Sequence, residues 1–181
     1  MKRISVLGAV WLLTGCAGLM MDVKDADKER ADVALKPSDQ VKLAEPDVKA
    51  IEADFGKEDA AQVSELLKQD LKKELADKKV EVSADSDKVI AVKVTHYAKG
   101  CGFCRGFFPF FGLGDSAVDG EVELDLGGKH RKLLVSKTGQ ASGMAEMGDQ
   151  TATNANYFAT VVVARLTESP SDKDKDKGKD D

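Results

Sequence analysis

The sequence has little tryptophan and no excess of basic residues, and each shortage argues against a class of function. Its one tryptophan, Trp11, lies in an apolar N-terminal segment, so the rest of the chain lacks the aromatic anchor of many ligand and carbohydrate sites. Lysine and arginine number 27 against 32 acidic residues, and the formal net charge is -5. No basic field therefore favours nucleic acid, and we predict no nucleic-acid partner.

The chain also lacks a recognisable catalytic set. Ser136 and Ser142 have no Gly-x-Ser-x-Gly setting. The acids from Asp115 to Asp125 mostly alternate along one predicted strand, which favours a solvated strand face over a calcium site. We therefore predict that the protein is not an enzyme and that it holds no metal or organic cofactor.

The N-terminus has the features of an export signal. Lys2 and Arg3 precede an apolar run that is too short to span a bilayer as a stable helix. The box Leu13-Thr14-Gly15-Cys16 then resembles the lipobox of bacterial lipoproteins, with an aliphatic residue, two small residues and a cysteine. The resemblance implies removal of residues 1–15 as a signal peptide and attachment of a covalent lipid to Cys16, which anchors the chain in a membrane.

The residue after the lipid-acceptor cysteine bears on localisation. It is Ala17 rather than aspartate. By resemblance to Gram-negative sorting, this residue favours the periplasmic face of the outer membrane. We predict a cell-envelope protein that contacts the membrane through its lipid and binds an envelope protein of unknown identity.

Charge-rich segments flank a candidate domain at residues 37–168. Residues 16–36 are polar and short of aromatics, so we predict a lipidated tether there. Residues 169–181 end in a Lys/Asp-rich run that has no apolar residue from Ser171 onward. Such a run cannot bury apolar surface, which predicts a disordered charged tail.

Hydrophobic periodicity predicts the order of elements within this domain. Apolar residues recur at helical spacing over 57–78, and again over 151–166, where a β-branched run weakens the pattern. Short or edge strands are predicted from brief alternations over 40–55 and at 80–82. Pro46 interrupts the first of these segments. Further strands are predicted over 89–97, 118–126 and 133–135, with a turn at Gly127-Gly128. This order predicts an α+β fold, with a mostly antiparallel sheet of about four to five strands and two helices packed on one face.

An ordered set of segments accompanies the lipobox. After the amphipathic helix come an acidic break (Ala84-Asp85-Ser86-Asp87), a hydrophobic strand (VIAVKVTHY), a second strand (EVELDL) and an Ala/Asn-rich helix (ATNANYFATVVVARL). Over about residues 40–167 this pattern resembles the YajG-like small envelope lipoproteins and related lipoproteins with a domain of unknown function. The resemblance implies an outer-membrane lipoprotein without known enzyme activity. It supplies no catalytic residues.

The connection between the strands near 97 and 116 has an unusual composition. Five of the seven phenylalanines lie within nine positions, flanked by glycines and interrupted by Pro109. Neither a helical nor a strand period fits, which predicts a long connection, here called the Phe-rich loop (residues 101–113). Its phenylalanines are Phe103, Phe107, Phe108, Phe110 and Phe111.

Cys101 and Cys104 lie in the same loop, and three interpretations stay open. In an oxidising compartment two thiols pair by default, so a disulfide would stiffen the loop while its phenylalanines cover one end of the core. The phenylalanines could instead form an exposed patch that binds a partner or the membrane interface, with or without the disulfide. The alternative function is thiol-redox or zinc chemistry, the latter with His96 and His130 as further ligands. Our leading hypothesis is a non-enzymatic lipoprotein that acts through contacts of the Phe-rich loop.

Overall fold

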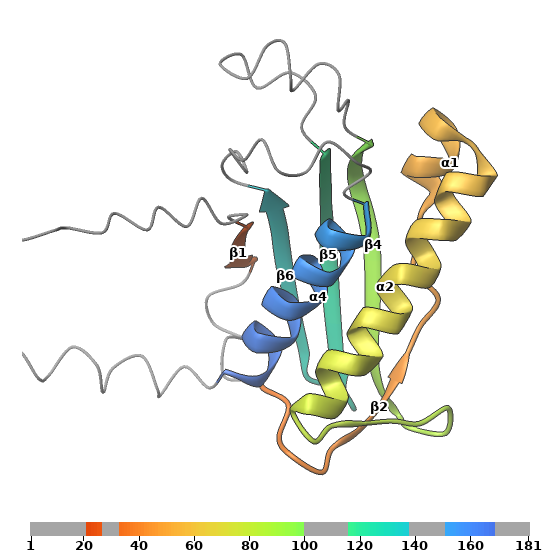
Figure 1. Cartoon of the computed structure of the whole chain (residues 1–181). Helices are drawn as coiled ribbons and strands as arrows, with labels where there is room; N and C mark the ends of the chain where they lie inside the picture. The colour runs from red at the N-terminus through yellow and green to blue at the C-terminus, as the bar shows by residue number, and fades with distance from the viewer. Residues whose placement is uncertain (1–20, 27–32, 100–115, 138–150, 169–181) are drawn as a thin grey trace, which may run out of the picture.

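The computed structural model describes residues 21–26, 33–99, 116–137 and 151–168 (Figure 1). Within these residues the chain forms three helices and a six-stranded sheet of order β1-β6-β5-β4-β2-β3. The elements in chain order are β1 Met21–Asp25, β2 Gln40–Leu43, α1 Lys49–Phe55, α2 Lys57–Asp77, β3 Glu81–Val82, β4 Lys88–Lys99, β5 Ser116–Leu126, β6 His130–Lys137 and α4 Thr151–Thr167.

The sheet is mostly antiparallel. Strands β4, β5, β6 and β1 pair with one another in antiparallel fashion, whereas β2 pairs parallel with both β4 and β3. Gly127 and Gly128 have φ values of 67° and 100° and form the predicted turn between β5 and β6, since glycine adopts such angles without steric cost. The predicted α+β class is confirmed, but the described sheet has six strands instead of four to five.

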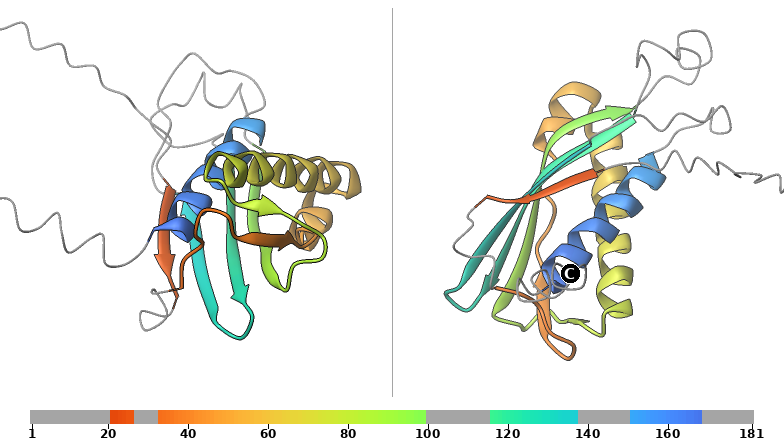
Figure 2. Two further views of the ribbon diagram at one scale, coloured as in Figure 1. Left: turned by 90° about the horizontal axis from the view of Figure 1, so that it is seen from below. Right: turned by 90° about the vertical axis from the view of Figure 1, so that its left-hand side faces the viewer.

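The helices cover one face of this sheet (Figure 2). The bounds of α2 and α4 agree closely with the two helices predicted from the sequence. These two helices pack against each other, and α1 packs on α2 and β4. The strand predicted from the alternation Val48 to Ile51 is wrong, because this segment forms α1. Val48 and Ile51 are also three residues apart, a helical spacing, and α1 buries Ile51 completely.

The first strand lies in the segment predicted to be a tether. Met21–Asp25 pairs with β6, and Val33 and Leu35 are core residues, only 6% and 2% exposed. The main-chain N–H of Leu35 also donates to the carbonyl of Leu166 at 2.8 Å. The domain boundary predicted at residue 37 is therefore wrong, because the fold already includes Met21. The polar composition of β1 was misleading because an edge strand buries only alternate side chains.

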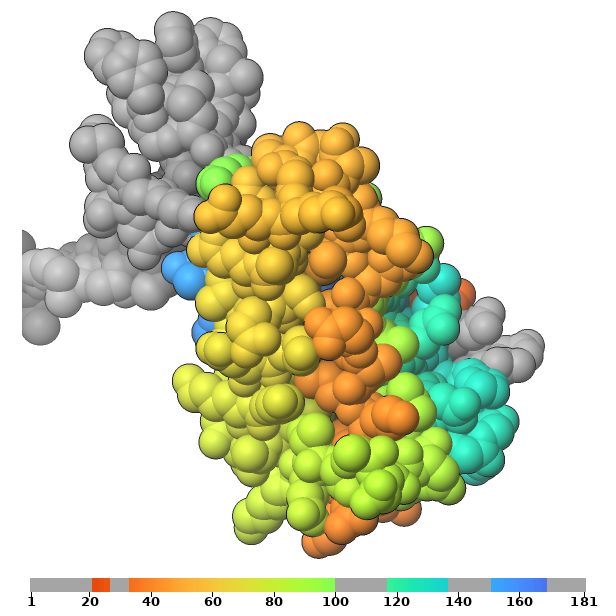
Figure 3. All heavy atoms as spheres, turned by 90° about the vertical axis from the view of Figure 1, so that its right-hand side faces the viewer, coloured from red at the N-terminus to blue at the C-terminus, as the bar shows by residue number. Residues whose placement is uncertain are grey.

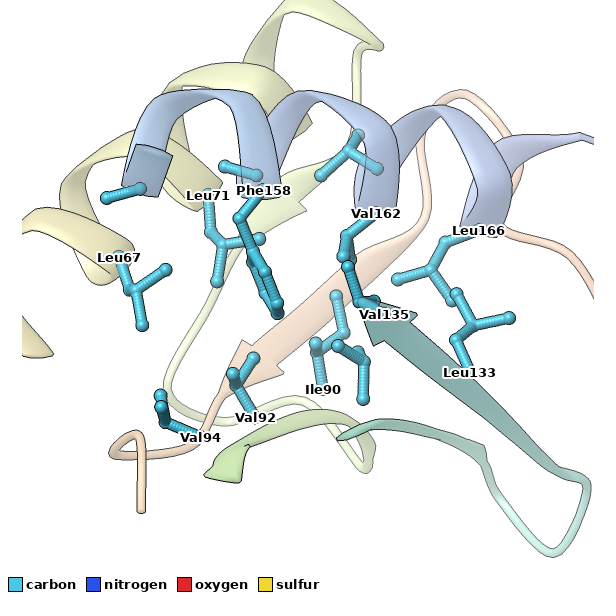
Figure 4. Close-up of a cluster of buried hydrophobic side chains, with 14 of the residues drawn as sticks. Leu67, Leu71, Ile90, Val92, Val94, Leu133, Val135, Phe158, Val162 and Leu166 are labelled. Atoms are coloured by element: carbon cyan, nitrogen blue, oxygen red, sulfur yellow. The ribbon is translucent and has the colours of Figure 1, made fainter. Parts of the chain in front are cut away.

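The core lies between the two long helices and the inner sheet face (Figure 4). Phe158 and Val162 point from α4 toward the side chains of β4 and β6, and Leu67 and Leu71 approach from α2. Each of these four side chains is fully buried. Complete burial of one such side chain stabilises the fold by about 1.5–3 kcal/mol. These contacts therefore determine how the helices pack on the sheet.

The absence of a side chain at Gly120 leaves room for the Phe158 ring against the sheet. A Cβ atom at residue 120 would lie 2.8 Å from the main-chain oxygen of Lys93 and 3.2 Å from the Phe158 ring. The first distance is shorter than real Cβ contacts and the second is tighter than most, so the inward position on β5 between Val118 and Val122 favours glycine.

Candidate functional site

The pairing of β4 with β5 brings Lys99 and Ser116, the described residues on either side of the Phe-rich loop, to one end of the sheet. The two strands pair from Lys88↔Leu126 to Lys99↔Ser116, so the chain leaves the hairpin opposite the point where it returns (Figure 1). The predicted disulfide residues Cys101 and Cys104 lie outside the described residues, so their pairing stays a prediction. The predicted contact residues Phe103, Phe107, Phe108, Phe110 and Phe111 also lie outside the described residues.

The N-terminal strand starts at this same end. Met21 pairs with Lys137, the last residue of β6, and the β5–β6 register places that end of β6 beside the start of β5. The predicted lipid acceptor, Cys16, lies outside the described residues, five positions before Met21. An extended chain spans at most about 3.6 Å per residue, so Cys16 can be no more than about 18 Å from Met21.

An aromatic contact joins three elements at this end. The Tyr97 ring on β4 meets the Phe55 ring of α1 edge to face, with centroids 5.1 Å apart and planes at 83°. The Tyr97 hydroxyl shares a hydrogen bond of 2.8 Å with Thr151 Oγ1 at the start of α4. Tyr97 is only 5% exposed, whereas Phe55 is 41% exposed. The sequence around Phe55 carries no signal for this role, because a lone phenylalanine has no pattern that separates an exposed ring from a buried one.

An ion pair fixes the last residue of β4. Lys99 Nζ lies 2.7 Å from Asp59 Oδ1 in the first turn of α2. The point at which the chain enters the Phe-rich loop is thus tied to a helix.

The four-residue zinc site of the alternative hypothesis is not assembled. His96 pairs with Asp119 across β4 and β5, while His130 pairs with Asp125 near the opposite end of the hairpin. Six residues of strand separate these positions, which is about 20 Å at 3.4 Å per residue, and a zinc ion holds its ligands about 2 Å away. No cluster of three potential metal-ligating side chains occurs within the described residues. The thiol-redox alternative, which involves only Cys101 and Cys104, stays a prediction.

The acids of β5 lie on the uncovered face of the sheet, as the alternation predicted. Lys132 on β6 donates to Glu121 at 2.8 Å and lies 3.6 Å from Glu123. The hydrogen bond from Lys132 is the main reason that the pKa of Glu121 lies below its ordinary value. These residues form a solvated strand face with cross-strand ion pairs.

A buried charge cluster ties β1 to the rest of the fold. Asp25 accepts hydrogen bonds from Nε of Arg131 on β6, at 2.6 Å, and from Arg165 on α4. Arg131 also donates to the main-chain carbonyl of Val33 at 3.0 Å, and Arg165 reaches Glu168 at 3.2 Å. The Asp25 and Arg131 side chains are only 6% and 2% exposed. The cluster joins four segments and is best explained as a structural clasp.

Charge pairing dominates the titration of Asp25. Burial alone would raise the pKa of this carboxyl, but the hydrogen bonds and charges of Arg131 and Arg165 outweigh burial and lower the pKa below 3.8. The carboxylate therefore stays ionised at neutral pH and is unsuited to general acid catalysis. Sequence reasoning missed this cluster because its members lie far apart in the chain and form no local motif.

A shallow polar pocket lies at the opposite end of the sheet. It has a volume of about 440 Å³, and it lies where the segments near residues 40 and 85 meet, at the lower end of the view in Figure 3. Lys88 Nζ pairs with Asp39 at 2.7 Å, and Ser86 Oγ donates to the Gln40 carbonyl at 2.7 Å. These polar groups are occupied in holding β2 to β4. The lining residues are Ser38, Asp39, Gln40, Asp85, Ser86, Asp87 and Lys88.

Comparison with known proteins gives a distant structural likeness. No family model and no curated protein matches the sequence. A solved PelC dodecamer from Paraburkholderia phytofirmans is similar over 82% of this chain and 99% of that chain, with 13% identity and a TM-score of 0.48. A point variant of the PelC dodecamer from the same organism is similar over 83% and 100%, with 13% identity and a TM-score of 0.46. Separately, none of the helices in the described ranges is long and apolar enough to cross a membrane.

Proposed function

We propose that this protein is a lipid-anchored component of the bacterial cell envelope that works without catalysis, through contacts made by its Phe-rich loop. Cys16 would carry the lipid at the periplasmic face of the outer membrane. The loop would dock on an envelope protein near that surface. The YajG-like pattern noted in the sequence is consistent with this proposal.

The observation that carries the proposal is that three strand ends, at Met21, Lys99 and Ser116, lie at the same end of the sheet. Met21 follows the lipobox closely, and it pairs with the last residue of β6. Lys99 and Ser116, which bracket the Phe-rich loop, lie at that same end of the antiparallel sheet (Figure 2). A short anchor and an apolar loop on one end of a domain favour a contact close to the membrane surface.

Rigid support at the base of the loop is consistent with a binding role. Lys99 is held by Asp59, and the neighbouring Tyr97 is held by Phe55 and Thr151. A binding segment held on rigid elements loses less conformational entropy when a partner docks. The exposed ring of Phe55 adds apolar surface at the same end.

The anchor is tested by the mass of the protein extracted from membranes. The mature chain should begin at Cys16 and carry the mass of a diacylglyceryl group. Cys16→Ser should leave the signal peptide in place and remove the added lipid mass. A wild-type chain that lacks lipid would contradict the anchor.

The contact surface is tested separately, by replacing Phe107, Phe108, Phe110 and Phe111 together with serine and recovering cross-linked partners from membranes. We expect the partner to be lost while the thermal unfolding temperature is unchanged. Leu134→Ser is the matched control, since it removes one exposed apolar side chain from β6, outside the loop. An unchanged set of partners in a folded quadruple variant would rule out the loop as the contact site.

A further inference from the structure

The sheet ends at β1, whose outer edge can accept another strand. In the order β1-β6-β5-β4-β2-β3, β1 is terminal, and the views in Figure 2 place it at the border of the sheet. Edge strands direct N–H and C=O groups outward, where they can pair with a strand of another chain.

The hydrogen bonds to β6 determine which residues of β1 point outward. Ala26 N donates to the carbonyl of Lys132 at 2.9 Å, which extends the β1–β6 register by one residue. In an antiparallel ladder the direction alternates, so the main-chain groups of Lys24 and Asp22 also face β6. Those of Met21, Val23 and Asp25 face away, and no described residue forms a main-chain hydrogen bond with β1 on that side.

We propose that β1 pairs with β1 of a second copy of this chain, antiparallel, across a two-fold axis at Val23. Val23 then lies opposite Val23 of the second copy, and Met21 lies opposite Asp25. All of these residues have outward main-chain groups, so about six hydrogen bonds form and the two sheets become continuous. This inference goes beyond the proposed function, because it requires neither the lipid nor the Phe-rich loop.

The charges on β1 select this register. Asp22 and Lys24 lie on the uncovered face, pair with each other within one chain, and have side chains that are 34% and 73% exposed. In the Val23-centred register each Asp22 lies opposite Lys24 of the other copy, at the closely spaced positions of the ladder. A shift by two residues keeps the hydrogen bonding but places Asp22 opposite Asp22, or Lys24 opposite Lys24. Among these registers, only the centred one combines outward hydrogen bonding with opposite charges at both contacts.

A charged edge usually discourages strand pairing, and β1 differs from that case. A lone lysine on an edge strand meets another lysine in a self-pair and repels it. In β1 the neighbouring aspartate turns the same lysine into an attractive contact at the register described above. Because the paired edge is short, we expect a dimer that dissociates on dilution.

The test is charge reversal in the full-length protein in detergent, with the mass measured by sedimentation velocity over a range of concentrations. Asp22→Lys and Lys24→Asp each place like charges opposite each other at both contacts. Each should weaken the dimer about tenfold or more, because two attractive pairs become repulsive. The double variant D22K/K24D and an equimolar mixture of the two single variants should both restore it.

Two controls separate pairing from folding and from shared micelles. Lys42→Asp reverses a lysine on β2, away from the β1 edge, and should leave the dimer unchanged. At a protein concentration at which the wild type is monomeric, all variants should keep the wild-type unfolding temperature, since Lys24 and Lys42 are exposed and Asp22 is partly exposed. A monomeric wild type, or a dimer that the single reversals do not weaken, would overturn the proposal. So would a failure of the double variant and of the mixture to restore the dimer.

Discussion

Asp25 on β1 accepts a hydrogen bond from Nε of Arg131 on β6 at 2.6 Å, although 106 residues separate them in the sequence. The same carboxylate accepts a hydrogen bond from Arg165 on α4. One side chain thus holds the N-terminal strand to the sheet and to the final helix.

Replacing this carboxylate should destabilise the fold strongly. Asp25→Asn keeps the shape but leaves two arginines, of which Arg131 is nearly fully buried, without their counter-charge. Removing one partner of a buried ion pair typically costs about 3–5 kcal/mol, and we expect the lower end because Arg165 is partly exposed. Urea unfolding measures the change in the free energy of unfolding. The exposed control Asp85→Asn should change it by less than about 0.5 kcal/mol, and an equal effect of both variants would contradict the clasp.

Acid should weaken the fold through the same group. The pKa of Asp25 is lowered on folding because Arg131 and Arg165 outweigh the effect of burial. The carboxylate therefore contributes its full stability above its ordinary pKa, and this contribution is lost as the pH falls through the lower folded-state pKa. We expect the unfolding free energy of the wild type to hold from about pH 7 to about pH 5 and to fall below about pH 4. Asp25→Asn should show a shallower fall, and parallel curves would exclude Asp25 as a main source of acid sensitivity.

A single methyl group at residue 120 should disturb the core. Gly120→Ala places its Cβ within 2.8 Å of a main-chain oxygen and 3.2 Å of the Phe158 ring. Overpacking of this kind costs about 1–3 kcal/mol, measured by thermal or urea unfolding. Glu123→Ala, on the exposed face of the same strand, serves as the control and should have little effect. Unchanged stability of Gly120→Ala would mean that Phe158 and β4 move aside at no cost.

The hydroxyl of Tyr97 should stabilise the end of the domain nearest the Phe-rich loop. Tyr97→Phe keeps the contact with the Phe55 ring but removes the buried hydrogen bond to Thr151. We expect a loss of about 1 kcal/mol in the free energy of unfolding. Faster hydrogen exchange at the first turn of α4 should accompany it, with Tyr157→Phe as the matched control. If hydrogen exchange at the first turn of α4 is unchanged in Tyr97→Phe, the hydrogen bond to Thr151 does not stabilise the start of this helix.

The sequence predicted well the parts of the fold that depend on local period. The stripe containing Leu67 and Leu71 predicted α2 because the apolar spacing was regular over many turns. The β-branched residues over 89–97 likewise predicted the central strand β4, which the structure extends to Lys88–Lys99. Short segments were harder, because Val48 to Ile51 fits a strand and a helix equally well.

Features that depend on distant contacts could not be predicted. β1 is polar in composition, and its place in the sheet depends on pairing with β6 and on the contacts of Asp25 with Arg131 and Arg165, all far along the chain. The separation of His96 and His130 follows from the hairpin register, which spacing along the sequence does not reveal. The position of Lys99 and Ser116 at the same end of the sheet as Met21 likewise follows from the sheet order.

The pairing of β1 with β6 also determines how the domain responds to tension. A pull on Met21 along the axis of β1 loads the ladder to β6 in shear, so its hydrogen bonds share the force. The Asp25 clasp lies at the far end of the strand, where it resists sliding after the first pairs have loosened. A strand fastened in this way resists a pull along its axis better than a pull across it, because a pull across the strand would break the hydrogen bonds to β6 one at a time.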